Sequence, residues 1–297
     1  MSTTGRMAAQ QDEWPRGSAA LPRKKGMSTT RLQQEEETDG GRTPPLQKIG
    51  GISYLNVRPL VYGIEDQVSY TEPSQLADLM YRRQFDVGIV PIAEVLLHDQ
   101  YDVLDGIAIA ARGAVRSVYL THRVPLEKIQ RVAVTPASRT SVWLLRVLLK
   151  IGYHIEPEFY PRPPGAKLSE HEAMLLIGDE AIWYAARHGK QWFWDLGAAW
   201  VDLTGLPFVF AAWAFQRDAE RQQLAALLRS AKADGMAHIE QIVQAATEAT
   251  PEFLRDYYSK CVWYDLGDAE KQGIRRFQQY LKQMGLVNGS HDIRYVN

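Results

Sequence analysis

The fold of this chain is predicted most directly from one short segment, Gly50-Gly51-Ile52-Ser53-Tyr54-Leu55-Asn56-Val57-Arg58-Pro59. An apolar beginning typical of a buried strand gives way to polar side chains. Because Pro59 disfavours the α conformation at Arg58, the pattern predicts a turn before any helix begins. Ser53, Asn56 and Arg58 would then lie in a strand-to-helix loop, where open α/β sheets bind ligands. An ordinary capped turn is the simpler interpretation of this loop taken alone.

The residues on either side of this loop predict a βαβ unit. Residues 49–54, 68–70 and 86–91 have the length and composition of strands. Between the last two, residues 73–83 begin with a proline, repeat apolar residues at helical spacing and end with two arginines. A strand, a helix and a strand in this order predict a parallel sheet.

A second α/β run occupies the middle of the chain. Strands are predicted at residues 106–112, 115–120, 131–134, 158–160 and 173–177, and a mostly buried helix at 142–151. Residues 205–214 are suited to a buried strand that returns the chain to its first part, and helices are predicted from about residue 217 onward. We therefore expect an α/β protein of two lobes, with residues 47–111 and 212–297 in the first and residues 112–211 in the second.

The ends and the composition of the chain bound its class. Residues 1–46 are rich in polar residues and glycine without any periodicity, which predicts a disordered extension. The rest has the balance of a globular protein, since the whole chain is 45% hydrophobic and 23% charged. A net charge of -1 gives no general attraction to nucleic acid or to acidic membranes.

The compartment is predicted from three features. Cys261 is the only cysteine, so an internal disulfide and a cysteine-rich zinc site are both excluded. No apolar run approaches the roughly 20 residues of a membrane span. Arg23-Lys24-Lys25 is not followed by the apolar core of a secretory signal. We expect a cytoplasmic protein.

A second polar cluster, Ser138-Arg139-Thr140-Ser141, precedes the predicted buried helix. Hydroxyl and backbone N–H groups at a helix N-terminus form a site for anions, and Arg139 adds a fork of donors for a carboxylate. The alternative is that Ser138 or Thr140 only caps the helix. The residues alone leave both interpretations open.

Other reactive side chains give weaker signals. Asp179 follows a strand and opens a helix, which predicts an N-cap or an orienting role. Ser117 lies in a predicted strand near a crossing between the lobes. None of the seven histidines has metal-ligand spacing, so we expect no metal site. Cys261 has no visible histidine partner, and no nucleophile-elbow pattern is present, so a hydrolase gains no support.

The aromatic residues of the second half are expected to fill the core rather than to stack on bases. They are the run Trp192-Phe193-Trp194 and the strand residues Phe208, Phe210 and Trp213.

Several motifs occur in an order that is shared with one known family. They are Ser53-Tyr54-Leu55-Asn56-x-Arg58-Pro59-Leu60, Phe85-Asp86-Val87-Gly88-Ile89-Val90-Pro91, Gly106-Ile107-Ala108-Ile109, Val115-Arg116-Ser117-Val118, Ser138-Arg139-Thr140-Ser141-Val142, Leu176-Ile177-Gly178-Asp179 and Thr204-Gly205-Leu206-Pro207-Phe208-Val209-Phe210-Ala211. Each motif is weak alone, but their order is specific. From about residue 48 to the C-terminus, the chain resembles the chorismate dehydratases of the futalosine route to menaquinone.

The resemblance implies both a fold and a reaction. The fold is the two-lobed α/β fold of type II periplasmic binding proteins, with the ligand in a cleft between the lobes. The reaction is that of a hydro-lyase, which converts chorismate to 3-[(1-carboxyvinyl)oxy]benzoate and water without a metal or an organic cofactor. The small-molecule substrate is the only partner implied.

Roles for individual residues follow from these motifs. Asn56 is expected to be the catalytic contact, because an amide both donates to and accepts from the departing hydroxyl and its neighbours. No protein base is predicted, and a carboxylate of the substrate is one candidate for that role. The predicted substrate-binding residues are Ser53, Arg58, Ser117, Ser138, Arg139, Thr140 and Ser141, with Asp179 as an orienting or capping group.

Two alternatives share the expected fold. One is a non-enzymatic solute-binding protein for small anions, against which the missing secretory signal argues. The other is the sister enzyme of the same route, 1,4-dihydroxy-6-naphthoate synthase. The Ser-Tyr-Leu-Asn and Ser-Arg-Thr-Ser motifs favour the dehydratase over this enzyme.

Overall fold

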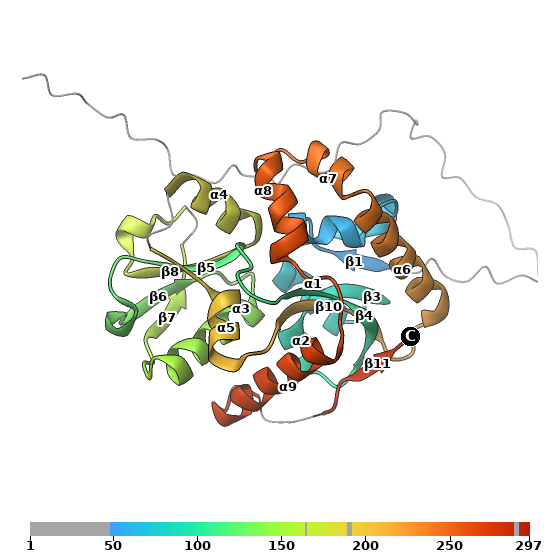
Figure 1. Cartoon of the computed structure of the whole chain (residues 1–297). Coiled ribbons are helices and arrows are strands. Elements are labelled where there is room, and N and C mark those ends of the chain that lie inside the picture. The colour runs from blue at the N-terminus through green and yellow to red at the C-terminus, as the bar shows by residue number, and fades with distance from the viewer. Residues whose placement is uncertain (1–47, 164, 189–191, 288–290) are drawn as a thin grey trace, which may run out of the picture.

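The computed structural model describes residues 48–163, 165–188, 192–287 and 291–297. The extension predicted to be disordered lies outside these residues. Two sheets with helices around them form two lobes side by side, one of them built from the middle of the chain (Figure 1). Among the described segments, no helix combines the length and the apolar character needed to span a bilayer.

The first sheet combines early strands with late ones. Its strands are β1 Ile49–Gly51, β2 Val68–Tyr70, β3 Val87–Pro91, β4 Tyr101–Ala111, β10 Phe208–Gln216 and β11 Arg294–Val296. They lie in the order β11-β4-β10-β3-β1-β2. β1 pairs in parallel with β2 and β3, as the βαβ pattern predicts. β10 runs antiparallel between β3 and β4, so the returning strand completes the first lobe.

The second sheet is built entirely from the middle of the chain. Its strands are β5 Val118–His122, β6 Arg131–Val134, β7 Glu158–Pro161, β8 Ala173–Ile177 and β9 Phe193–Asp195, in the order β7-β6-β8-β5-β9. β6 pairs in parallel with β7 and β8, whereas β5 is antiparallel to β8 and β9. The sequence pattern missed β11, and it placed the aromatic residues of β9 in the core without predicting a strand there.

Helices cover both sheets. The α-helices are α1 Pro73–Tyr81, α2 Ile92–Leu97, α3 Arg139–Val147, α4 Gly178–His188, α5 Leu196–Thr204, α6 Arg221–Ala237, α7 Ile239–Ala245, α8 Pro251–Asp256 and α9 Asp268–Gln283. A π-helical turn, Leu148–Gly152, continues α3, and a second one, Tyr257–Cys261, continues α8. Short 3₁₀ turns lie at Leu55–Leu60, Glu65–Gln67, Leu126–Lys128 and Leu168–Glu170.

Two predicted boundaries were wrong in an informative way. The strand before Ser53 ends at Gly51, and the expected open loop is a 3₁₀ helix, Leu55–Leu60, which we call the Asn56 turn. A 3₁₀ turn accommodates Pro59 because bonds on either side, Val57 N–H to Tyr54 O and Val61 N–H to Arg58 O, close it without the missing N–H. In the second lobe, α3 already begins at Arg139, because Ser138 caps it.

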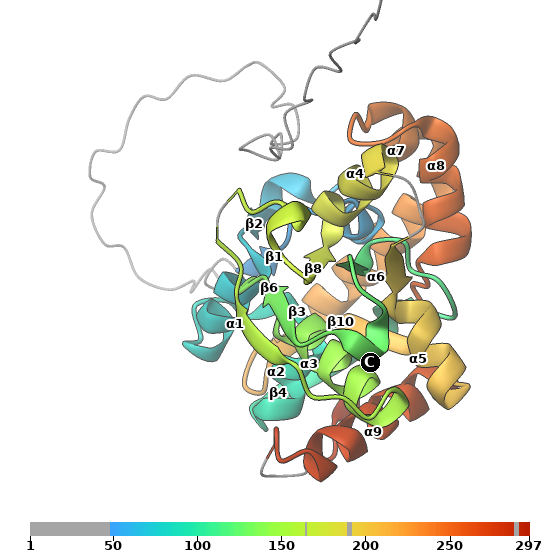
Figure 2. The same ribbon diagram turned by 90° about the vertical axis from the view of Figure 1, so that its left-hand side faces the viewer.

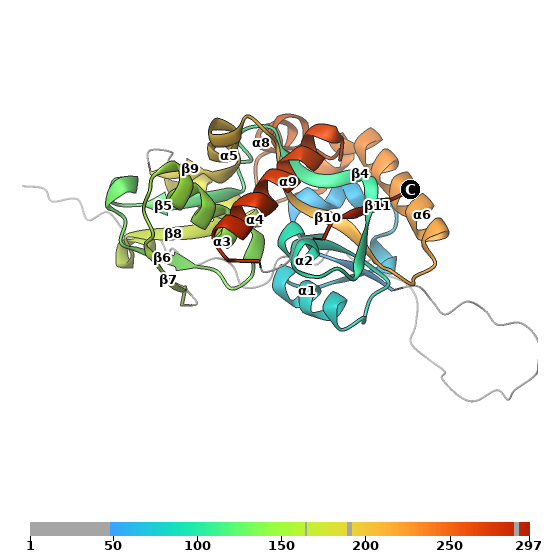
Figure 3. The same cartoon turned by 90° about the horizontal axis from the view of Figure 1, so that it is seen from below.

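The lobes are also joined on the side of the C-terminal helix. Trp200 of α5 is fully buried, and its ring lies 5.1 Å from the ring of Phe208 and 5.8 Å from that of Phe277 in α9. Seen from below, α9 extends from the first lobe towards α3 of the second (Figure 3). An aromatic cluster therefore braces the two lobes against each other.

One carboxylate organises the first crossing between the lobes. The Asp195 carboxylate accepts the N–H groups of Val115 at 3.0 Å and Arg116 at 2.7 Å, and it caps α5 through Gly197 and Ala198. Burial raises the pKa of Asp195 against the lowering effect of these bonds. β10 begins at Phe208 and pairs with β3 and β4, so residues 208–211 belong to the first sheet, and the division of the chain into lobes otherwise stays a proposal.

Candidate functional site

A cavity of about 580 Å³, open solvent at its mouth included, lies between the lobes. It lies at the boundary between two lobes, which is a common place for small-molecule sites. The first lobe contributes Ile52, Tyr54 and Asn56, among others, and the second contributes residues from the ends of β5 and β8 and from the start of α3. The two polar segments that the sequence singled out therefore meet at one cavity.

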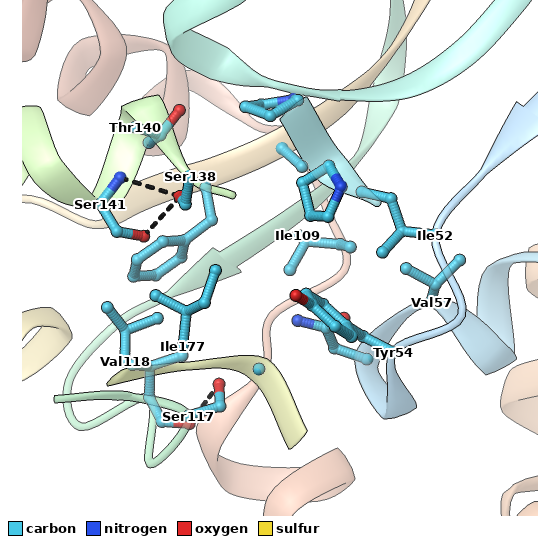
Figure 4. A pocket seen from close by; sticks show the side chains of 17 residues that line it. Ile52, Tyr54, Val57, Ile109, Ser117, Val118, Ser138, Thr140, Ser141 and Ile177 are labelled. Atoms are coloured by element: carbon cyan, nitrogen blue, oxygen red, sulfur yellow. Dashed lines mark hydrogen bonds between the residues drawn. The ribbon is translucent and has the colours of Figure 1, made fainter. Parts of the chain in front are cut away.

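The start of α3 forms a wall of hydroxyl groups. Ser138 Oγ accepts the Ser141 N–H at 3.2 Å and donates to Ser141 Oγ at 2.9 Å. Figure 4 shows these two side chains and Thr140 across the cavity from Ile52 and Val57. Because the Ser141 hydroxyl accepts from Ser138, its own proton is free to point elsewhere, and it donates to no other described residue. The hydroxyl cluster that caps α3 therefore also lines the cavity where an anion is expected to bind.

Thr140 also ties the lobes together. Its Oγ1 accepts the N–H of Ala93, at the start of α2 in the first lobe, at 3.0 Å. Thr140 is buried and lines the cavity. This wall of the cavity is therefore fixed to the first lobe.

Asn56 projects from the opposite lobe with an incomplete set of hydrogen bonds. It lines the cavity, and its Oδ1 is buried without a hydrogen-bond partner among the described residues. A buried amide oxygen without a partner costs about 1–3 kcal/mol, so such groups point to a donor from a ligand or from water.

Ser117 lines the cavity near the first crossing, where the sequence placed it. Its Oγ accepts the hydroxyl of Tyr257 at 3.0 Å. Tyr257 comes from the C-terminal part of the chain, and burial raises its pKa, so the hydroxyl stays protonated as a donor. No local pattern pointed to Tyr257, because its contact with Ser117 joins positions 140 residues apart.

The two predicted arginines lie outside the cavity lining. Arg58 forms an ion pair with Glu248, and Arg139 donates to Glu94 at 3.2 Å. Glu94 is buried, and its burial raises the pKa of its carboxyl against the opposing effect of Arg139. The structure thus pairs both guanidinium groups with protein carboxylates. Their predicted contact with a substrate stays a prediction, as does that of Ser53, which also lies outside the lining.

Asp179 is buried behind the cavity wall, at the start of α4. Its Oδ1 accepts the N–H of Leu55 at 3.0 Å. Burial raises the pKa of Asp179 to about 7, against the lowering effects of this bond and of Arg58. The carboxyl therefore changes its charge in the neutral range.

This shift predicts a pH-dependent difference in stability between the wild type and Asp179→Asn. The folded-state pKa lies above the unfolded value of about 3.9, so the carboxyl contributes most stability at low pH and loses that contribution as the pH rises towards 7. Between about pH 5 and about pH 8, the free energy of unfolding of Asp179→Asn should therefore rise relative to that of the wild type, by on the order of 2 kcal/mol.

Urea unfolding at several pH values measures this difference. Glu180→Gln is a control on the same helix, because Glu180 is partly exposed and pairs with Arg162 at 2.7 Å. A constant difference between the wild type and Asp179→Asn across this range would contradict the prediction.

Several lining residues were missed or misassigned. Phe210 packs against the core as predicted and also lines the cavity. Trp192 is 45% exposed, against the prediction, whereas Phe208 and Trp213 are buried as predicted. Gly178 lines the cavity with a φ of +60°, in the left-handed region that favours glycine. Among the described residues, no group of three histidine, cysteine, aspartate or glutamate side chains is arranged to hold a metal ion.

Comparison with known proteins gives a consistent picture. Residues 47–283 match a family model described as menaquinone biosynthesis. A chorismate dehydratase from Thermus thermophilus is 31% identical over 251 residues, which cover 77% of this chain and 92% of the relative. A chorismate dehydratase from Campylobacter jejuni is 27% identical over 238 residues, which cover 79% of this chain and 93% of the relative.

Solved structures share the fold at low identity. A crystal structure from Archaeoglobus fulgidus has a TM-score of 0.64 at 15% identity and covers 82% of this chain and 99% of its own. The periplasmic aliphatic sulphonate binding protein of Escherichia coli has a TM-score of 0.57 at 16% identity, covering 83% of this chain and 95% of its own. The predicted two-lobed periplasmic-binding-protein-like fold is confirmed.

Proposed function

This chain belongs to the menaquinone-biosynthesis family, and we propose that within it the protein is a chorismate dehydratase. The observation that carries the proposal is the match to two proteins of that name over more than nine-tenths of their length. The product would be 3-[(1-carboxyvinyl)oxy]benzoate, formed with one molecule of water by a cytoplasmic hydro-lyase of the futalosine route. The solute-binding alternative shares the fold, but no comparison favours it at the level of sequence.

The dehydration depends more on correct positioning of the substrate than on a strong acid or base in the protein. Chorismate loses the C3 hydrogen as a proton and the C4 hydroxyl with its bonding electrons, and the ring becomes aromatic. Aromatisation supplies the driving force, so correct orientation of the substrate accounts for much of the rate. The lining of the described cavity contains no aspartate, glutamate or histidine, which supports a carboxylate of the substrate itself as the acceptor of the C3 proton.

The lining residues divide this work in our proposal. Asn56 contacts the departing C4 hydroxyl, because its Oδ1 lacks a protein partner and its amide also donates. The N-terminus of α3, with Ser138, Thr140 and Ser141, binds one substrate carboxylate. Ser117 provides a further hydroxyl on the same side of the cavity.

The test is to incubate the purified protein with chorismate and to follow the ultraviolet spectrum, with mass spectrometry of the product. The appearance of the aromatic ether with the loss of one water supports the proposal. Tight binding of chorismate without turnover would favour a solute-binding protein instead. The absence of both binding and turnover would leave the sister enzyme, whose substrate differs.

A further inference from the structure

The start of the Asn56 turn is capped from the other lobe. The first N–H groups of any helical turn need partners from outside it, and Tyr54, at the N-cap position, provides no side-chain hydrogen bond. Asp179 supplies one, because its Oδ1 accepts the Leu55 N–H at 3.0 Å from 124 residues away in the sequence. A carboxylate bound to a backbone N–H is among the stronger neutral-donor hydrogen bonds.

The other polar group of Leu55 is held as well. The hydroxyl of Tyr258, in the second π-helical turn, donates to the Leu55 carbonyl oxygen at 3.0 Å. That carbonyl belongs to the peptide bond between Leu55 and Asn56. Two side chains from distant segments therefore fix the backbone immediately before Asn56, and both are buried.

A close contact sets the position of Asp179 itself. A Cβ atom on the preceding Gly178 would lie 2.8 Å from the ring of Tyr54, so the two lobes touch here without room for a side chain. The Gly178 N–H also donates to the Ser117 carbonyl oxygen at 2.8 Å. The views in Figures 1 and 2 place α4 at the same end of the molecule as α7 and α8.

We propose that Asp179 is a positioning residue for Asn56: it holds the backbone N–H of Leu55 so that the Asn56 amide faces the reacting part of the substrate. The inference rests on the proposed dehydration of chorismate. It follows from the hydrogen-bond inventory of Asn56, whose Oδ1 has no partner among the described residues. The side chain must take its orientation from the backbone, and that backbone is held across the lobe boundary.

The charge of Asp179 should then appear in the pH dependence of turnover. Burial, the largest cause, raises the pKa of Asp179 to about 7. The Leu55 N–H and Arg58 lower this pKa, and Glu248 raises it. The hydroxyls of Tyr54, Tyr257 and Tyr258 also lie within the field of this carboxylate. Protonation weakens the bond from Leu55 N–H, so kcat should fall as the pH drops below about 7.

Two variants of Asp179 test this role. Asp179→Ala should lower kcat for chorismate by about 10- to 100-fold, the range expected for a misplaced catalytic group, while KM changes much less. Asp179→Asn keeps an oxygen that accepts the Leu55 N–H but carries no charge, so its kcat should lie above that of Asp179→Ala, near the value that the wild type reaches below pH 7, and should show no acidic fall near pH 7. Glu180→Ala, on the same helix, removes the contact with Arg162 and should leave kcat unchanged.

Amide hydrogen exchange gives a readout that does not depend on activity. A peptide that contains Leu55 should exchange faster in Asp179→Ala than in the wild type, whereas Asp179→Asn and Glu180→Ala should keep its protection. Circular dichroism shows whether each variant is folded.

The outcomes separate this inference from the proposed function. A wild type that does not convert chorismate defeats the proposed function, whatever the exchange data show. An active wild type with equal kcat and equal exchange in Asp179→Ala defeats only the positioning role. If Asp179→Asn loses as much kcat as Asp179→Ala while Leu55 keeps its protection, the carboxylate acts directly on the reaction, and the positioning role is wrong.

Discussion

Asn56→Ala is expected to lower kcat for chorismate by about 100- to 1,000-fold, the usual cost of removing one hydrogen-bonding group at an oxygen that gains charge in the transition state. The variant loses the only cavity-lining side-chain amide in the described part of the chain. If the amide acts chiefly on the departing hydroxyl, KM should change far less than kcat, because the interaction strengthens as the C–O bond breaks.

The same substitution should have little effect on stability. The buried Oδ1 of Asn56 makes no hydrogen bond with the described residues, so alanine removes no protein partner and relieves an unsatisfied group. Steady-state kinetics and urea unfolding, measured on the same preparation, separate the two effects. Asn297→Ala, at the exposed end of the chain, is the matched control and should keep the wild-type kcat. Full turnover with an unchanged KM in Asn56→Ala would remove this residue from the mechanism.

Local patterns in the sequence were sufficient for the framework of the site. Residues 49–59 and 138–141 were recognisable because each joins an apolar run to a cluster of polar side chains at the end of a predicted strand. The structure brings Asn56, Ser117, Ser138, Thr140 and Ser141 to one cavity. Resemblance to a family supplied the reaction, which the residue types alone did not specify.

The rest depends on contacts between distant residues. Arg58 is paired with Glu248 across 190 positions, and Arg139 with Glu94 across 45, and neither carboxylate carries a local signal. Asp179 looked like an N-cap of its own helix, because that is the commonest use of an aspartate there. Its observed partner is Leu55 N–H in the other lobe. Such pairings follow from how the lobes meet, which no local pattern encodes.

Gly235→Ala is expected to destabilise the protein by about 3 kcal/mol, at the upper end of the cost of overpacking. Gly235 is buried in α6, and a Cβ atom there would lie 2.0 Å from the carbonyl oxygen of Pro59, in the Asn56 turn. That neighbour is backbone and cannot rotate away, so the helix or the turn must shift. In an unobstructed helix the same change would instead stabilise by roughly 1 kcal/mol. The sign of the effect therefore tests the close packing itself.

Urea unfolding of Gly235→Ala beside Gly152→Ala measures this effect. Gly152 ends the first π-helical turn, and a Cβ atom there would meet nothing within 4 Å, so its replacement should be neutral or slightly stabilising. If α6 holds its place and the turn moves, Asn56 moves with it, and kcat should fall together with stability. A Gly235→Ala protein as stable as Gly152→Ala would show that the Asn56 turn yields freely. A turn that yields so easily would not be held in position by Asp179 and Tyr258, which would contradict the positioning role.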